Sequence, residues 1–200
     1  MMLANFLNKV EQIERPVVLL EGRRKISAAE FDAAEALGRL LATRLPHAVF
    51  RSGNAEGSDE AFSRGVAAVD ASRLHIVAPY PGHRLNFRYP DATYDSPESM
   101  TKVQEEPIRK ATIAASPHSE GLIHAKHPRL RSKAQYLIRD TMKVCGAGLP
   151  PPAFACFLVD PHNPDAGGTG HTIRVCRQAG VPFVFQNVWG KWLSTMKRAE

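Results

Sequence analysis

The sequence predicts an α/β protein of three layers, with a mostly parallel sheet of five or more strands between helices. Two observations predict this class. Short apolar segments alternate with stretches of helical periodicity, and nearly every apolar segment runs into a loop of small, polar or basic residues. A chain of 200 residues can bury one full hydrophobic core. We therefore predict a single domain over residues 1–200.

The first half of the chain carries the alternation most clearly. Leu3, Phe6, Leu7, Val10 and Ile13 recur at helical spacing and predict a short amphipathic helix over residues 3–14. Strands are then predicted at residues 16–20, 48–51 and 74–78, with helices between them, the first of which opens with a capping box at residues 27–30. This β-α-β-α-β order implies a parallel sheet with right-handed crossovers.

Residues 85–128 interrupt this rhythm. They are rich in proline, serine, histidine and charge, and we predict an insertion with short helices around residues 96–103 and 107–115 that acts as a lid or a subunit contact. A helix around residues 134–145, a strand at 154–159, a glycine loop, a helix and a last strand at 182–185 complete the chain. The predicted fold is Rossmann-like.

The composition favours an anionic partner without specifying it. Net charge is +6 and the pI is about 9.4, but the positive charge is spread along the chain, which suits a nucleotide pocket, a nucleic-acid surface or a basic protein with neither. Three cysteines without CxxC spacing and no export signal predict a cytoplasmic protein. No apolar run is long enough to span a membrane, so no membrane partner is expected.

Four loops follow predicted strands and share one chemical character. Because the carboxyl ends of parallel strands meet at one edge of a sheet, we predict a composite ligand site there. Its candidate residues are Gly22, Arg23 and Arg24, then Ser52, Gly53, Asn54, Gly57, Ser58 and Asp59, then Pro79, Tyr80 and Arg84, and finally Gly167, Gly168, Thr169, Gly170, His171 and Thr172.

The glycine segment from Gly167 to Thr172 is the strongest single candidate. Glycines let the backbone approach a ligand, and the start of the following helix offers free N–H groups to a phosphate. The segment matches neither a Walker A loop nor a standard dinucleotide fingerprint, and a flexible loop without a ligand is the alternative. Arg23, Arg24 and Arg84 could contact phosphate, Asp59 could cap a helix or hold ribose, and Tyr80 could stack on a base.

Other chemistry finds little support. His118, His124 and His127 lie close together in the sequence, but no cysteine or carboxylate spacing accompanies them, so no metal is predicted. No Gly-x-Ser-x-Gly elbow is present, and no cysteine lies beside a base in the sequence. We expect no cofactor, and whether the protein is an enzyme stays open.

Three loops together resemble the SLOG superfamily, which joins the DprA/SMF proteins with the LOG "lysine decarboxylase-like" phosphoribohydrolases. The resemblance lies in Gly22–Arg23, in Ser52–Asp59 and in Gly167–Thr172 with the helix and strand that follow. It implies a Rossmann-like fold that binds nucleotides at the strand ends, often as a homo-oligomer. The hydrolases of the family use an arginine, matched here by Arg131, and a glutamate after the glycine motif, where this chain has Ile173 and Arg174.

The resulting hypothesis is a protein that binds a nucleotide or a nucleotide-derived ligand at the strand ends. One alternative is a nucleotide N-glycosidic hydrolase, in which Glu21, Asp59 or Glu120 would replace the missing glutamate. The other is a DprA-like protein that binds single-stranded DNA, for which the sequence shows few aromatic residues in a basic context.

Overall fold

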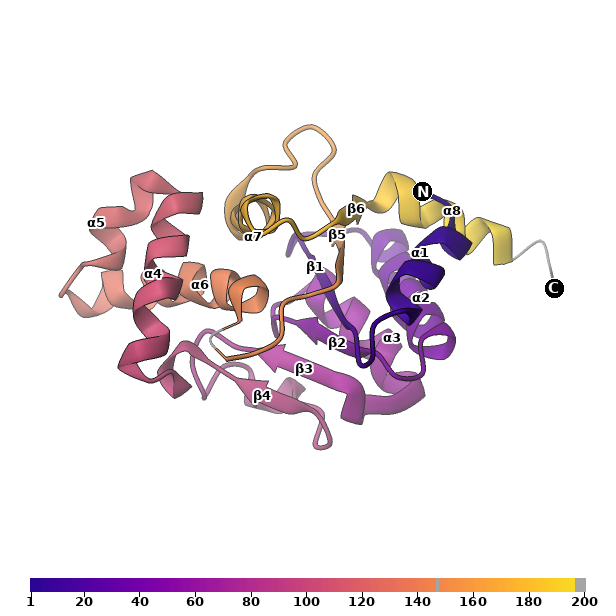
Figure 1. The fold of residues 1–200 in the computed structure, drawn as a ribbon, viewed down its shortest axis with the longest axis horizontal. Helices are drawn as coiled ribbons and strands as arrows, with labels where there is room; N and C mark the ends of the chain where they lie inside the picture. Colours follow the sequence, from indigo (N-terminus) through magenta and orange to yellow (C-terminus); the bar gives the residue numbers. More distant parts are fainter. Residues whose placement is uncertain (147, 197–200) are drawn as a thin grey trace.

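The computed structural model describes residues 1–146 and 148–196 and contains one six-stranded, all-parallel sheet (Figure 1). The strand order is β4-β3-β2-β1-β5-β6. The strands are β1 (Val17–Gly22), β2 (Val49–Ser52), β3 (Leu74–Val77), β4 (Thr93–Asp95), β5 (Phe154–Leu158) and β6 (Phe183–Phe185). Helices cover both faces, so the predicted α/β, Rossmann-like class is confirmed. All five predicted strands are present, and β4 is a sixth.

One face of the sheet is covered by four helices. They are α1 (Leu3–Glu11), α2 (Ala28–Arg44), α3 (Ser58–Asp70) and α8 (Gln186–Met196). Val18 and Leu20 of β1 point into this core, and Phe6 of α1 packs on Phe154 and Trp192 with ring centroids 4.8 and 4.9 Å away. The predicted first helix therefore packs on its own domain. Helix α8 was not predicted; Trp189 Nε1 on it donates a 2.9 Å hydrogen bond to the Phe157 carbonyl of β5.

The opposite face is covered by α4 (Lys102–Ala115), α6 (Pro128–Cys145) and α7 (Gly167–Gln178), with the short α5 (Glu120–Ile123) beside them. Leu19 of β1 points into this second core. The alternation of strand side chains also directs Glu21 towards α6 and α7, because residues two apart along a strand share a face. A carboxyl group thus lies under these helices.

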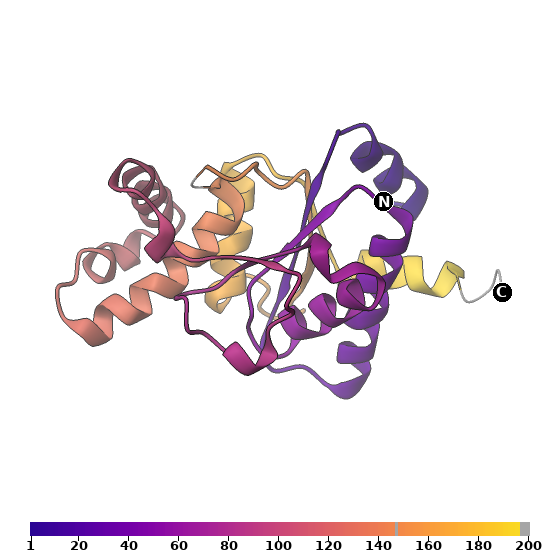
Figure 2. The same ribbon diagram turned by 90° about the horizontal axis from the view of Figure 1, so that it is seen from below.

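The structure corrects the interpretation of residues 85–128. The segment includes β4, which pairs in parallel with β3: Thr93 lies opposite His75, and Asp95 lies opposite Val77. Part of the segment therefore belongs to the sheet. The first predicted helix is a single 3₁₀ turn at Pro97–Ser99, and the second begins earlier than predicted, as α4 at Lys102, and continues through Pro107. Helices α4, α5 and the first half of α6 extend from the end of the sheet as a helical lobe (Figures 1 and 2). Whether the chain is one domain stays a prediction.

The order of strands places a crevice between β1 and β5. The chain leaves β1 for α2 on one face and leaves β5 for α7 on the other, although the two strands are neighbours. Such a switch point opens a space outside the carboxyl ends of the two strands, where ligands bind in open α/β sheets. Gly22, at the end of β1, and Gly167, at the start of α7, border this space.

Candidate functional site

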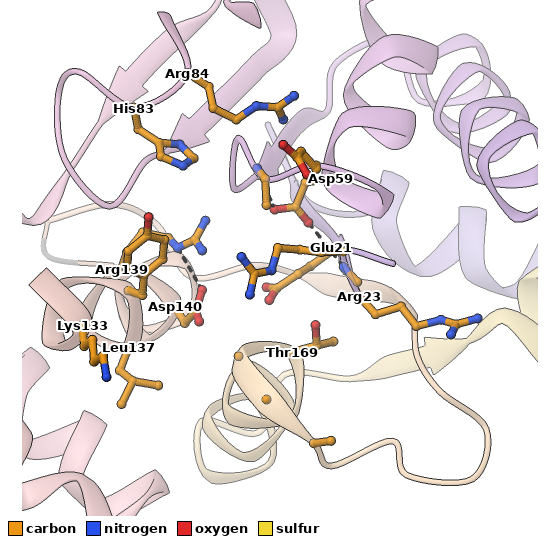
Figure 3. Close-up of a pocket in the computed structure, with 18 residues that line it drawn as sticks. Glu21, Arg23, Asp59, His83, Arg84, Lys133, Leu137, Arg139, Asp140 and Thr169 are labelled. Carbon is orange, nitrogen blue, oxygen red and sulfur yellow. Dashed lines mark hydrogen bonds and ion pairs between the residues drawn. The ribbon is translucent and has the colours of Figure 1, made fainter. Parts of the chain in front are cut away.

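A cavity of about 730 Å³ lies at this switch point (Figure 3). Its volume is within the range of small-molecule sites. Eight of the predicted site residues line it, namely Gly22, Arg23, Arg24, Asp59, Arg84, Gly167, Gly168 and Thr169. Ten further residues also line it, namely Glu21, Ala55, Glu56, His83, Lys133, Tyr136, Leu137, Arg139, Asp140 and Ala166. The cavity therefore joins the ends of β1 and β5 to the loop after β3 and to one side of α6.

The glycine segment is the first turn of α7 and not a loop. Helix α7 begins at Gly167, and Ala166 at its N-cap position makes no side-chain cap. Gly170 already donates its N–H to the Ala166 carbonyl, at 2.9 Å. Because only the first N–H groups of a helix lack internal acceptors, the free donors are those of Gly167, Gly168 and Thr169. The free amides therefore end at Thr169, whereas the sequence-based prediction extended the candidate phosphate site to Thr172.

His171 and Thr172 lie in the interior and do not line the cavity. Both side chains are fully buried. His171 is held between the hydroxyls of Ser116 and Thr141, each 2.8 Å from a ring nitrogen, and burial lowers its pKa to about 4. Thr172 donates to Glu21 at 3.0 Å. Their role in this structure is to fix α7 against α4, α6 and β1.

Five buried ionisable groups form a charge cluster on the floor of the cavity, defined by Glu21, Asp59, Arg139, Asp140 and Lys143. Lys143 is the centre, 2.6 Å from Glu21 Oε2 and 2.9 Å from Asp140 Oδ1. Asp140 Oδ1 is also 2.9 Å from Arg139 Nε. Among the described residues, Asp59 makes no ion pair with the two cations of the cluster and accepts hydrogen bonds from the N–H groups of Gly22 at 3.3 Å and Ala55 at 3.4 Å. It anchors the loop after β2 and does not cap α3.

The charge cluster holds three carboxyl groups and two cations, and burial and the neighbouring charges together set the protonation of the carboxyl groups. Burial raises the pKa of Glu21 to about 7, although Lys143 opposes the rise. Burial also raises the pKa of Asp59. For Asp140, Arg139 and Lys143 overcome the effect of burial and lower the pKa. Near neutral pH, Asp140 is therefore an anion, and Glu21 is distributed between its two protonation states.

The Arg139 guanidinium has buried hydrogen-bond donors that no described residue accepts. Its Nη1 is buried and has no hydrogen-bond partner within residues 1–146 and 148–196. A Cβ atom on Gly53 would collide with this nitrogen and would lie 2.5 Å from Asp59 Oδ2, so the glycine leaves the space that the guanidinium occupies. An unsatisfied buried donor is costly in a native fold unless a ligand or water completes it.

The arginines predicted to contact phosphate differ in their freedom. Arg23 is 2.5 Å from Glu30, and Arg84 is 2.7 Å from Glu60 and lies 4.2 Å from the centroid of Phe87. Arg24 and Lys133 are exposed at the rim, where the described part of the chain gives them no ion pair. The rim therefore carries two exposed cations without a described ion pair and two that are paired with a glutamate.

Several predicted residues shape the loops and do not line the cavity. Ser52 donates to the Leu20 carbonyl at 2.7 Å, and Ser58 donates to the Arg23 carbonyl at 2.7 Å. Asn54 donates to the His83 carbonyl at 3.0 Å, which ties the loop after β2 to the loop after β3. Gly57 has a φ of +79° and packs against the Arg24 backbone. Pro79 and Tyr80 lie outside the lining, although Tyr80 contacts His83.

Sequence reasoning missed the contribution of α6. Charged residues in an amphipathic helix normally face solvent, so Arg139, Asp140 and Lys143 were not candidates. One signal was available in the sequence, because these charges are interleaved with the apolar residues Ile138, Met142 and Val144. The structure shows that all three apolar residues are buried. Glu21 gave a second signal, since it is a carboxylate in the buried strand that begins at Val17.

Two further properties of the described residues bear on function. No helix in the described part of the chain combines the length and apolarity needed to cross a membrane. Within the same residues, no group of three or more histidine, cysteine or acidic side chains is arranged to hold a metal ion. The carboxylates of the charge cluster are instead occupied with arginine, lysine and backbone donors.

Comparison with known proteins finds one structural neighbour and no relative. No family model matches the chain, and no curated protein matches it. Among solved structures, DNA processing protein A from Helicobacter pylori, described for its single-stranded DNA binding mode, aligns with a TM-score of 0.46 and 12% identity. The alignment covers 88% of this chain and 67% of that protein. At this similarity neither family nor function transfers, and the SLOG resemblance stays a prediction.

Proposed function

We propose that the cavity binds a nucleotide or a nucleotide-derived ligand, with its phosphate at the start of α7. The observation that carries the proposal is the pairing of two unsatisfied donor sets. The free N–H groups of Gly167, Gly168 and Thr169 lie at the positive end of an uncapped helix. The buried Arg139 guanidinium, with a free Nη1, lines the same cavity. A phosphate is the kind of group that both donor sets recognise, because it accepts several charge-assisted hydrogen bonds.

The remaining lining suits the sugar of such a ligand. Asp59 and Glu21 are carboxyl groups at the end of the cavity formed by β1. Carboxylates hold ribose hydroxyls in nucleotide-binding α/β folds. Arg24 and Lys133 add exposed positive charge at the rim, where they would attract an anion during association.

Binding can be tested by titrating the wild type and two matched variants with nucleoside monophosphates in a calorimeter. Thr169→Asp places a carboxylate among the free amides, and Thr169→Asn places a neutral group of the same size there. Two unit charges about 5 Å apart at an effective dielectric constant of about 20 repel by roughly 3 kcal/mol. We therefore expect affinity to fall about 100-fold or more in Thr169→Asp and to change little in Thr169→Asn. Equal affinities of the two variants would show that the phosphate does not bind at the start of α7.

A second candidate function is hydrolysis of the N-glycosidic bond of a bound nucleotide. The observation that favours it is Glu21, whose carboxyl group is partly protonated near neutral pH while Asp140 in the same cluster is ionised. A protonated acid beside an ionised carboxylate is the pairing that glycoside cleavage uses. Incubation with a nucleotide panel should then release free base, at a rate that falls as pH rises through about 7 and that Glu21→Gln abolishes. No released base would dismiss hydrolysis and leave binding intact.

The third candidate is binding of single-stranded DNA across the rim. Phe87 is 55% exposed and lies under Arg84, which gives an aromatic ring in a basic context that the sequence did not suggest. Such surfaces stack bases and pair with the backbone. Titration with an oligonucleotide at two salt concentrations should show a steep loss of affinity as salt rises. Absence of binding at low salt would eliminate this candidate.

A further inference from the structure

One wall of the cavity is aromatic and has no part in the phosphate and sugar contacts. It consists of His83, from the loop after β3, and Tyr136 of α6, with Tyr80 next to them but outside the lining. We call these three residues the aromatic wall. The His83 ring lies edge-on to both tyrosines, with centroids 5.3 Å from Tyr80 and 6.2 Å from Tyr136. Figure 3 shows His83 across the cavity from Thr169. His83 and Tyr136 line the same space as the start of α7.

The aromatic wall is held from behind. Asn54 donates to the His83 carbonyl at 3.0 Å, and the neighbouring Arg84 is paired with Glu60 at 2.7 Å. A side-chain hydrogen bond joins Tyr136 to Tyr80, and burial and this bond both raise the pKa of Tyr136. A prearranged aromatic surface binds a flat ring at a low cost in conformational entropy.

His83 offers the wall one unused hydrogen bond. Its Nδ1 is buried and has no partner among the residues that the structure describes. Burial lowers the pKa of His83 to about 4, and the nearby Arg139, Arg84 and Arg88 act in the same direction. The imidazole is therefore neutral at physiological pH. A neutral ring does not compete with Arg139 for the phosphate, so the natural partner of Nδ1 is an uncharged polar edge.

From this arrangement we infer that the aromatic wall is the subsite for the base of the nucleotide, with Tyr136 packing on the ring and His83 reading its polar edge. The inference rests on the proposed function and adds the heterocycle as a required part of the ligand. Sugar phosphates without a base can bind at α7 and Arg139, but they have no ring to pack on Tyr136 and leave His83 Nδ1 without a hydrogen-bond partner. The cavity should therefore discriminate between a nucleotide and its sugar phosphate.

The test compares two probes, AMP and ribose 5-phosphate, on the full chain. Stacking of one base on an aromatic side chain contributes about 1–3 kcal/mol, or roughly 5- to 150-fold in affinity. Wild type should bind AMP more tightly by that factor. Tyr136→Leu should lose this advantage without weakening ribose 5-phosphate, while Tyr136→Phe, which keeps the ring, should retain it. Tyr136 is 37% exposed, and an unchanged melting temperature would verify that Tyr136→Leu folds.

His83 is tested by selectivity across AMP, GMP, CMP and UMP. His83→Phe preserves an aromatic ring and removes the hydrogen bond, so the spread of affinities among the four should narrow. Equal wild-type affinity for AMP and ribose 5-phosphate would overturn the base subsite and leave the phosphate site standing. An equal loss of both probes in Tyr136→Leu would also overturn it. If the wild type binds neither probe, the proposed function fails and the inference fails with it.

Discussion

The Glu21→Gln substitution should make the protein less sensitive to alkaline pH, because it removes a carboxyl group that burial keeps partly protonated. Glu21 is 3% exposed and accepts hydrogen bonds from Lys143 and Thr172. Glutamine preserves this pattern, since its oxygen can accept from Lys143 and its amide can donate to the Thr172 hydroxyl. The variant therefore resembles the protonated wild type at every pH.

The sign and size follow from linkage. The pKa of Glu21 is about 7 in the folded protein against an ordinary 4.5, so the folded state binds more protons within that interval. Stability is then greatest below the lower value and falls as pH rises towards about 7. Each pKa unit corresponds to about 1.4 kcal/mol, which gives about 3 kcal/mol in total, most of it lost between pH 5 and pH 8.

Chemical denaturation at pH 5 and pH 8 measures this effect. Relative to Glu21→Gln, the wild type should lose about 2–3 kcal/mol of unfolding free energy between the two pH values. Glu56→Gln is the matched control, because it removes a carboxylate from an exposed position of the same cavity. Parallel pH profiles for the wild type and Glu21→Gln would refute the claim that this carboxyl group is buried among excess negative charge.

Three other substitutions test the charge cluster and its surroundings. Lys143→Met should lower the free energy of unfolding by about 3–5 kcal/mol, since it leaves buried carboxylates without their main cation, and a loss below about 1 kcal/mol would contradict the ion pairs. Gly53→Ala should displace the Arg139 guanidinium and weaken nucleotide binding in calorimetry with little change in melting temperature, and unchanged binding would argue against a role for Arg139. Gly22→Ala should destabilise the fold itself, because its Cβ would lie 2.6 Å from Ser58 Oγ and would collide with the Leu158 carbonyl; normal melting would contradict that packing.

The sheet was predictable because most of its strands leave an apolar signal. Five of the six strands were found from short apolar segments between helical patterns. Strand β4 (Thr93–Asp95) was not predicted because one of its three residues is aromatic and none is aliphatic, whereas the equally short β6 is apolar throughout. Helix α8 was not predicted, although Trp189 and Trp192 lie three residues apart, which is the spacing of one helix face, and both are buried.

The site was predictable only where residues follow strands. The rule that ligands bind at the carboxyl ends of parallel strands located Gly22, Asp59 and Gly168 at one cavity. The start of α7 was placed too late because glycine has a low helix propensity, and a side-chain cap was lacking at Ala166. Arg139 and Asp140 reach the cavity only because α6 lies across the sheet, and that is a property of tertiary packing.

A nucleotide phosphate bound at the first turn of α7 should perturb the backbone amides of that turn. NMR of the ¹⁵N-labelled protein during titration with AMP follows each of these amides separately. The largest shifts should fall on Gly168 and Thr169, saturate with the same affinity that calorimetry reports, and disappear in Thr169→Asp. Saturable shifts that cluster elsewhere and leave these two amides unchanged would show that the phosphate does not bind at α7.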